Sequence, residues 1–436
     1  MEIIPLLLII FVCSSLLVGY PVAFTLAGVS IIFALICSLF GVFDLNLFKN
    51  LPIRIFGIMN NQTLLAVPLF VFMGVVLEKS GIAAKMLQDM AKVFAGIKGG
   101  LGISIVIVGA LLAASTGIVG ATVVTMGLMS LPALLKEGYD KKFSSGLVAA
   151  TGTLGQIIPP SIALVLLGDV MSTAYASAQN MIAAETGDFS PMKAVSVGDL
   201  FVGALLPGLI ICILFLIYTI FWNRNLHKSY VNVTKVSLLN LLNTLLPPIL
   251  LIFMVLGSII FGIATPTEAA GVGAIGSILI CLYYKKFNIE LLKEASRRTA
   301  LVTTMVFTIL IGASIFSLIF RGVGGDELIS LVFEMLPGGK YSALFFVMLM
   351  IFLLGFILDF IEICYVFVPL IAPPLLMMGF DPVWLGIMLA INLQTSFLTP
   401  PFGFSLFYLR GVADKSIRTI EIYKGVIPFI AIQLLV

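Results

Sequence analysis

Two stretches of the sequence decide the fold: GTLGQIIPPSIAL at 152–164 and QTSFLTPPFGFSLF at 394–407. Each places two consecutive prolines in the middle of an apolar segment that is long enough to cross a membrane. A proline lacks the backbone N–H and clashes with the carbonyl four residues before it, so each pair must interrupt a helix. We therefore expect two Pro-Pro-broken helices, over 143–168 and 382–409.

The composition around these stretches is that of a membrane protein. Hydrophobic residues make up 61% of the 436 residues and charged residues only 10%, against roughly a quarter charged in soluble domains. The mean hydropathy is +1.20. So few charges cannot cover the surface of a soluble protein, and we expect an all-α polytopic membrane protein. The net charge of +3 gives no sign of nucleic-acid binding.

Few side chains are available for metal or acid–base chemistry. The five cysteines lie singly in apolar runs and are expected to be small core residues. The one histidine, His227, lies in a basic segment, which excludes a histidine metal cluster and argues against a Ser-His-Asp site. The sequence also lacks a phosphate-binding G-x-x-x-x-G-K-[ST] motif. We expect no enzyme activity.

The two Pro-Pro pairs belong to an internal repeat. They are separated by 241 residues, and the same offset aligns LPALLKEGYD at 131–140 with APPLLMMGFD at 372–381. Several matches in order at nearly one offset indicate two homologous halves. We expect these halves at 1–222 and 236–436, joined by a cytosolic linker at 223–235.

Each half is predicted to contain scaffold helices, an amphipathic arm, a helical hairpin and the broken helix. In the first half these elements are expected at 1–78, 79–98, 99–135 and 143–168, followed by a helix at 200–222. In the second half they are expected at 237–284, 285–298, 341–378 and 382–409, with a further helix at 299–320. The last apolar run, 425–436, is shorter than its counterpart 200–222, which indicates a truncated final helix.

The hairpin segments 99–135 and 341–378 allow two topologies, because each could form two full spans or one re-entrant hairpin. Treating both as hairpins inverts the halves and gives about ten spans with an external N-terminus. This topology puts 19 of the 24 basic residues on the cytosolic side, as the positive-inside rule requires. The alternative makes 143–168 and 382–409 re-entrant and moves eight of these charges outside. We therefore favour two re-entrant hairpins.

The breaks are candidate cation sites. The proline pairs free four backbone carbonyl oxygens, those of Gly155, Gln156, Ser396 and Phe397. Neighbouring hydroxyls are on Ser161, Thr395, Ser396 and Thr399. Such oxygens suit a hard cation, here Na⁺, and irregular backbone at membrane depth is tolerated where it is buried or lines a wet cavity. Prolines that only bend a helix are the alternative, but paired breaks in two inverted halves favour a site.

The centres of the hairpins are expected to meet the breaks. The first tip, 113–122, is small and hydroxyl-bearing, which suits an anion at a helix start or tight helix packing. In the second tip, Asp359 is a carboxylate at membrane depth and is expected to bind or couple a cation. Glu362, one turn later, either shares this role or caps a helix. Glu268 follows Pro266 and is expected to stabilise a helix start.

Two kinds of segment lie outside this core. The arms 79–98 and 285–298 carry spaced lysines among apolar residues, so they either link a moving part to a fixed one or anchor to acidic headgroups. The insert 169–199 has no counterpart in the second half. It is expected outside, as a contact for an external partner or as a solvated loop.

Four motifs resemble the large membrane subunit of tripartite ATP-independent periplasmic (TRAP) transporters. They are TPTEAAG at 265–271, AASTGIVGATVVTMG at 113–127, GTLGQIIPPS at 152–161 and TSFLTPPFGFSLFYLRG at 395–411, and the likeness covers essentially the whole chain. The resemblance implies an elevator-type, sodium-coupled importer of a small organic acid in the bacterial inner membrane. Its implied partners are a four-helix small membrane subunit, on a separate chain, and a soluble periplasmic binding protein.

The resemblance also implies site residues at the tips and breaks. The implied sodium-binding residues are Ser115, Thr116, Gly117, Gly155, Gln156, Ser161, Gly355, Asp359, Ser396, Phe397 and Thr399. The implied substrate-binding residues are Thr122, Ser161, Asp359, Thr399 and Gly403. No cofactor is expected apart from the coupling Na⁺.

One tip departs from the family pattern. Many members read Ser-Gly-Ser-Ser where this chain has Thr116-Gly117-Ile118-Val119, which argues against sialate as substrate. Two stretches, Phe360-Ile361-Glu362 and Gln394-Thr395-Ser396-Phe397, look more like the subgroup that handles 2-oxo acids, lactate or amino-acid-like anions. An organic-anion transporter of another inverted-repeat family, working without a binding protein, is the alternative. A channel is disfavoured by the internal inverted repeat, and an intramembrane enzyme because Asp359 lacks a catalytic partner.

Overall fold

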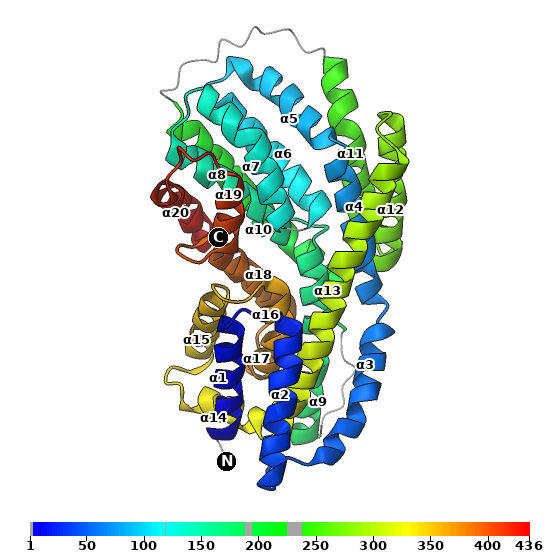
Figure 1. Ribbon diagram of the computed structural model, residues 1–436, viewed down its shortest axis with the longest axis vertical. Helices are drawn as coiled ribbons and strands as arrows, with labels where there is room; N and C mark the ends of the chain where they lie inside the picture. Colours follow the sequence, from blue (N-terminus) through cyan, green and yellow to red (C-terminus); the bar gives the residue numbers. More distant parts are fainter. Residues whose placement is uncertain (1–2, 118, 188–193, 225–237) are drawn as a thin grey trace. The chain divides into compact units, whose positions relative to one another are not determined.

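The computed structural model describes residues 3–117, 119–187, 194–224 and 238–436 of the chain. Within these ranges the chain is helical and contains no strand, so the predicted all-α class is confirmed (Figure 1). His227 and most of the predicted linker 223–235 lie outside the described residues.

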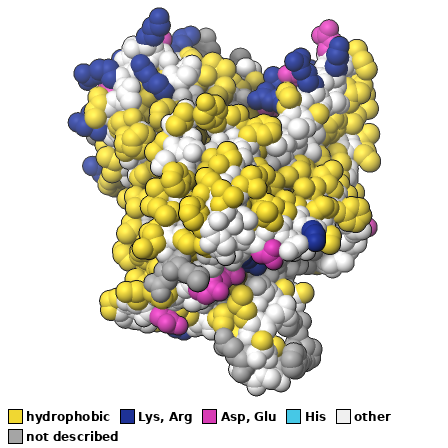
Figure 2. All heavy atoms as spheres, turned by 60° about the horizontal axis from the view of Figure 1, so that its bottom comes forward, with side chains coloured by type: hydrophobic (Ala, Val, Ile, Leu, Met, Phe, Trp, Pro, Cys, Tyr) yellow, Lys and Arg dark blue, Asp and Glu magenta, His cyan; other side chains and the backbone are white. Residues whose placement is uncertain are grey.

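Seven of the described helices are long and apolar enough to cross a membrane, or up to nine if each of two bent helix pairs is one span. Large apolar side chains on these helices are exposed, among them Leu206, Phe253 and Ile275. Apolar side chains cover much of the face that Figure 2 shows. Such a surface is unfavourable in water, whereas lipid tails solvate it. The chain is therefore a polytopic membrane protein.

The described residues of the first predicted half form ten α-helices. They are α1 (Ile3–Leu17), α2 (Val22–Leu39), α3 (Leu51–Met59), α4 (Ala66–Lys79), α5 (Ile82–Val93), α6 (Gly100–Thr116), α7 (Val119–Lys136), α8 (Lys141–Thr153), α9 (Ile162–Thr186) and α10 (Val197–Trp222). Short 3₁₀ turns lie between them at Leu45–Asn50 (η1), Thr63–Leu65 (η2), Phe94–Gly96 (η3) and Leu154–Gln156 (η4).

The second predicted half contains ten more over residues 238–436. They are α11 (Leu238–Ile260), α12 (Pro266–Tyr283), α13 (Ile289–Gly322), α14 (Gly325–Met335), α15 (Gly339–Leu354), α16 (Phe360–Val366), α17 (Val368–Met377), α18 (Pro382–Leu398), α19 (Phe404–Val412) and α20 (Thr419–Leu435).

The proline pairs interrupt helices as the sequence predicts. The first break separates η4 from α9, and the second separates α18 from α19. Both Pro-Pro peptide bonds are cis. Segment 99–135 forms α6 and α7, which pack against each other on either side of Gly117. Segment 341–378 contains α16 and α17 and most of α15.

Some elements differ in extent from the predicted segments. The arm 285–298 and the helix 299–320 are joined in α13, because no proline or glycine interrupts residues 289–311. The insert 169–199 is helical as far as Thr186, since α9 continues through its alanine-rich first part. At the start of α12, Thr265 and Glu268 form a capping box, the structural role expected for Glu268.

The chain forms two compact units, and each contains segments from both predicted halves. Unit 1 comprises Met1–Leu64, Leu166–Ser196 and Leu301–Gly386. Unit 2 comprises Leu65–Val165, Val197–Ala300 and Ile387–Val436.

Unit 1 is built around α13 and the short helices α14 to α17. Helix α1 packs on α2 and α14, and α17 packs on α14, α15 and α16. Gly312 permits α13 to approach α2 closely, because a Cβ at this position would lie 2.4 Å from the Ala23 carbonyl oxygen. Phe316 and Phe320 of α13 stack with ring centroids 5.8 Å apart in the buried core. Close helix packing therefore holds the unit together.

Unit 2 contains the first hairpin and both breaks. Helix α8 packs on α6, α7 and α20, and α4 packs on α12. A Cβ on Gly146 of α8 would lie 2.0 Å from the Gly425 carbonyl oxygen of α20, so only glycine permits this crossing. Beside the crossing, Phe215 of α10 meets Phe429 of α20 edge to face, with centroids 5.0 Å apart. Backbone contact and aromatic packing together fix α8 against α20.

Candidate ion and substrate site

At the first break, a single hydroxyl group lies within hydrogen-bond distance of two freed carbonyl oxygens. The Ser161 hydroxyl donates to the Gly155 carbonyl oxygen at 2.7 Å and lies 3.1 Å from that of Gln156. All three residues are buried. A hydroxyl has one proton and a carbonyl oxygen has two lone pairs, so lone pairs of both carbonyls remain available.

The Gln156 side chain adds a further oxygen. Its Oε1 is buried and has no hydrogen-bond partner among the described residues, and the residue is 2% exposed. Buried polar atoms in proteins are nearly always paired, so an orphaned one points to a bound water or ion. The sequence drew attention to the Gln156 carbonyl and missed this side-chain oxygen.

The first hairpin tip lies directly against the first break. Gly117 ends α6 with a left-handed φ of +60°, and a Cβ there would lie 2.9 Å from Ile162 Cγ1, at the start of α9. A Cβ on Gly155 would lie 3.2 Å from the Ala113 carbonyl oxygen in the tip. The Ser115 hydroxyl is buried and donates to Leu112 of its own helix at 2.9 Å. The tip and the break therefore form one packed site.

At the second break, as at the first, a serine hydroxyl donates to a freed carbonyl oxygen. The sequence did not single out this serine. The Ser405 hydroxyl, in α19, donates to the Phe397 carbonyl oxygen at 2.8 Å and is buried. The Thr399 hydroxyl donates to the Thr395 carbonyl oxygen at 2.7 Å. Gly403 is required here, since its Cβ would lie 2.5 Å from the Phe397 carbonyl oxygen.

Gln394 is a second buried amide, which the sequence analysis names only as part of a stretch similar to one subgroup of the family. It lies on α18 one turn before the break, is 0% exposed, and neither its Oε1 nor its Nε2 has a hydrogen-bond partner in the described chain. Ser396 is buried beside it in the sequence. The only available sequence signal was a glutamine inside an apolar span, which is costly unless it is functional.

Helix α19 joins the second break to the first hairpin. A Cβ on Gly120 of α7 would lie 2.9 Å from the Tyr408 ring of α19, and Gly127 of α7 meets Val412 in the same manner. Thr122, on the intervening turn of α7, is buried. Unit 2 thus packs together the residues of the first tip and of both breaks. These are Ser115, Thr116, Gly117, Thr122, Gly155, Gln156, Ser161, Ser396, Phe397, Thr399 and Gly403.

The second tip, with Gly355 and Asp359, belongs to unit 1. Asp359 is the N-cap of α16, and its Oδ1 accepts from the Phe360 N–H at 2.8 Å. Glu362 completes a capping box by accepting from the Asp359 N–H at 2.9 Å. The capping alternative considered for Glu362 is therefore the observed one. The predicted pairing of Asp359 with the second break stays a prediction.

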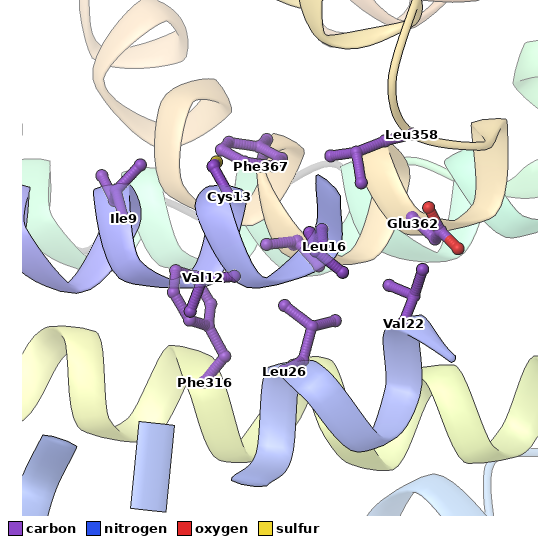
Figure 3. Close-up of a pocket in the computed structure, with 11 residues that line it drawn as sticks. Ile9, Val12, Cys13, Leu16, Val22, Leu26, Phe316, Leu358, Glu362 and Phe367 are labelled. Carbon is purple, nitrogen blue, oxygen red and sulfur yellow. The ribbon is translucent and has the colours of Figure 1, made fainter. Parts of the chain in front are cut away.

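Glu362 also borders a small cavity in unit 1. Its other walls are apolar side chains from α1, α2 and α13 and from the segment around α16, among them Val12, Leu26 and Phe316 (Figure 3). The cavity measures about 10 Å³, which is at most the room that one water needs. It therefore holds no organic ligand.

Apolar spans that are interrupted by buried, oxygen-lined breaks are typical of secondary transporters. The fold is similar to that of a solved membrane protein. The solved structure of the Alcanivorax borkumensis YdaH transporter matches with a TM-score of 0.60 at 13% sequence identity, covering 89% of this chain and 86% of that chain.

The sequence comparison identifies the family. The chain belongs to the Tripartite ATP-independent periplasmic transporter, DctM component family, whose sequence model matches residues 7–436. It is 29% identical over 393 residues to the C4-dicarboxylate TRAP transporter large permease protein DctM of Rhodobacter capsulatus, covering 89% of this chain and 87% of that protein. It is 27% identical over 427 residues to the sialic acid TRAP transporter large permease protein SiaM of Vibrio cholerae, covering 95% and 91%. The resemblance found in the sequence is confirmed.

Proposed function

We propose that this chain imports a small organic acid anion across the bacterial inner membrane and is driven by an inward sodium gradient. The proposal adds a coupling ion, a direction and an elevator motion to the family membership. The observation that carries it is the first break, where Gln156 Oε1 is buried without a hydrogen-bond partner beside two freed carbonyl oxygens.

Sodium suits the first break because its ligands would be neutral oxygens. The carbonyl oxygens of Gly155 and Gln156 share the single proton of Ser161, so each keeps lone-pair capacity for a cation. Gln156 Oε1 supplies a third oxygen. Hard cations prefer such ligands, and a shell without carboxylates suits a single positive charge.

A second sodium ion is proposed at the second break. Its ligands would be the carbonyl oxygens of Ser396 and Phe397 and the hydroxyl of Thr399. The orphaned amide of Gln394 supports a polar ligand in this region. At the second tip we propose a coupling role for Gly355 and Asp359, because a carboxylate at membrane depth costs at least ~2.5 kcal/mol and is retained where it functions.

The substrate anion is proposed to contact Thr122, Ser161, Thr399 and Gly403, which all belong to unit 2. Thr122 lies in the first turn of α7, Ser161 precedes α9 and Gly403 precedes α19. Helix starts present free N–H groups and the positive end of the helix dipole, which favour an anion. Half-helices that start at a break at membrane depth are the usual place for this interaction in transporters.

The family supports two proposed partners, a periplasmic binding protein that delivers the anion and a small membrane subunit of four helices. The alternative function is ion-coupled anion transport without a binding protein. The two functions differ in one measurable requirement, because only the first needs a soluble component outside the membrane.

The test is uptake into proteoliposomes that contain this chain and its small subunit. The radiolabelled substrate is the acid that the cognate binding protein retains. We expect saturable uptake that requires the binding protein and an inward sodium gradient, with the acid recovered unchanged. Gln156→Leu should raise the sodium concentration for half-maximal uptake roughly tenfold, because one charge-assisted ligand is lost. The exposed Gln88→Leu on α5 is the matched control and should behave as wild type.

Three results would contradict these expectations. Uptake that is equal in sodium and potassium gradients would rule out sodium coupling. A wild-type sodium dependence in Gln156→Leu would remove the first break from the ion site. Full uptake without the binding protein would establish the alternative function.

A further inference from the structure

Unit 1 contains a second, larger cavity whose residues lie outside the sites considered so far. It measures about 310 Å³, which is at the lower end of ligand pockets and sufficient for a small organic anion. Five helices contribute to its walls, namely α3, α9, α13, α16 and α17. Its polar lining residues are Arg54, Asn61, Asp169, Thr173, Ser314, Ser317 and Tyr365.

Arg54 supplies an unpaired positive charge to this cavity. Within the described chain, no acid lies within 4 Å of its guanidinium and the group makes no hydrogen bond. The nearby charge that acts on it is that of another cation, Arg321. A guanidinium presents five N–H donors in a planar fork that matches a carboxylate. The unpaired positive charge of Arg54 therefore favours the binding of an anion next to it.

Tyr365 orients an acceptor of the same cavity. Its buried hydroxyl faces the carboxylate of Asp169, which also lines the cavity. A tyrosine hydroxyl at a buried position normally has a partner. Asp169 is that partner, so Arg54 is the donor that remains for the carboxylate of a ligand.

Asp169 restricts which anion fits. One of its oxygens, Oδ1, accepts from the Asn61 amide at 2.8 Å, and a carboxylate has about four lone-pair sites in total. The remaining capacity can accept from a hydroxyl or an ammonium group. A second carboxylate in the ligand would instead meet a like charge, which is unfavourable away from bulk water.

We propose that this cavity binds a small organic monocarboxylate that carries a hydrogen-bond donor, such as a 2-hydroxy or 2-amino acid, and discriminates against dicarboxylates. Arg54 binds the carboxylate, and Asp169 accepts from the donor group. The inference rests on the proposed function in so far as that function makes an organic acid the ligand.

The test measures binding to the purified full-length chain, by thermal shift over a concentration series of lactate, propionate and succinate. Propionate lacks the hydroxyl of lactate, and succinate carries a second carboxylate. Wild type should bind lactate more tightly than propionate and succinate most weakly. Arg54→Gln should weaken lactate binding roughly ten- to a hundredfold. Lys49→Gln removes an exposed charge nearby in the sequence and should leave binding unchanged.

Asp169→Asn keeps the shape of the side chain and removes its charge. We expect the variant to bind succinate more tightly than wild type does and to lose part of the preference for lactate over propionate. Preference of wild type for succinate, or unchanged binding in both Arg54→Gln and Asp169→Asn, would overturn the proposal. Binding needs neither a sodium gradient nor partners, so failed uptake with normal lactate binding would reject the proposed function and leave this site standing.

Discussion

Two serine hydroxyls close the two broken helices, and only one of them is visible in the sequence. Ser161 directly follows a proline pair, so its proximity to the freed carbonyls of Gly155 and Gln156 could be predicted. Ser405 lies eight residues after its partner Phe397, and only the turn of the backbone through the break brings the two together. Side-chain oxygens such as Gln156 Oε1 could not be predicted either, because their lack of a partner depends on packing.

At the residue scale, Gly117→Ala should destabilise the chain by about 1–3 kcal/mol, because a left-handed φ is unfavourable with a Cβ and Ile162 leaves no room. The measurement is the thermal unfolding midpoint in detergent. Gly411→Ala is the matched control, since it lies in α19 with nothing within 4 Å of the added Cβ. The control should be neutral or more stable. Equal midpoints for Gly117→Ala and wild type would contradict the packed tip.

Asp359 allows capping and coupling to be separated by one substitution. Asparagine caps a helix about as well as aspartate, so Asp359→Asn should fold normally and retain the start of α16. Loss of the charge should abolish sodium-driven uptake or raise the half-maximal sodium concentration at least roughly tenfold. Asp44→Asn, at the N-cap of η1, is the matched control. A folded Asp359→Asn with wild-type sodium dependence would show that the carboxylate only caps.

At the scale of elements, local signals in the sequence explain most helix ends. The proline pairs, Gly117 and the Thr265–Glu268 box end or start helices where their chemistry requires it. The continuity of α13 was missed for a physical reason. Arg297 and Arg298 mark the edge of an apolar segment, but arginine is a good helix former, so the backbone continues through the change in polarity.

The hairpin topology predicts on which side of the membrane α8 and α15 begin. Because 19 of 24 basic residues then face the cytosol, the start of α8 should be cytosolic and the start of α15 external. Single cysteines at Lys141 and Lys340, in a chain without its five native cysteines, would report this arrangement. An impermeant maleimide added outside intact cells should label position 340 and spare position 141. Protection of both positions would favour two full spans in place of each hairpin, and labelling of position 141 alone would contradict the topology.

At the scale of the whole molecule, the repeat and the packing divide the chain differently. The repeat relates residues 241 positions apart, whereas unit 1 and unit 2 each combine segments of both halves. Equivalence in sequence identifies which residues correspond, and it was sufficient to predict the paired breaks. It does not identify which helices touch, because the contact between α8 and α20 depends on two glycines that no periodic pattern distinguishes.

The crossing of α8 and α20 has a consequence for how the protein is made. Gly146 and Gly425 touch in the finished chain, yet about 280 residues must leave the ribosome between them, on the order of 15–60 s at ordinary rates of synthesis. During that interval the face of α8 around Gly146 has been inserted without its native neighbour. Lipid, another helix or a membrane chaperone must cover this face until α20 arrives. A nascent chain stopped before α20 should therefore be the form that quality-control proteases recognise.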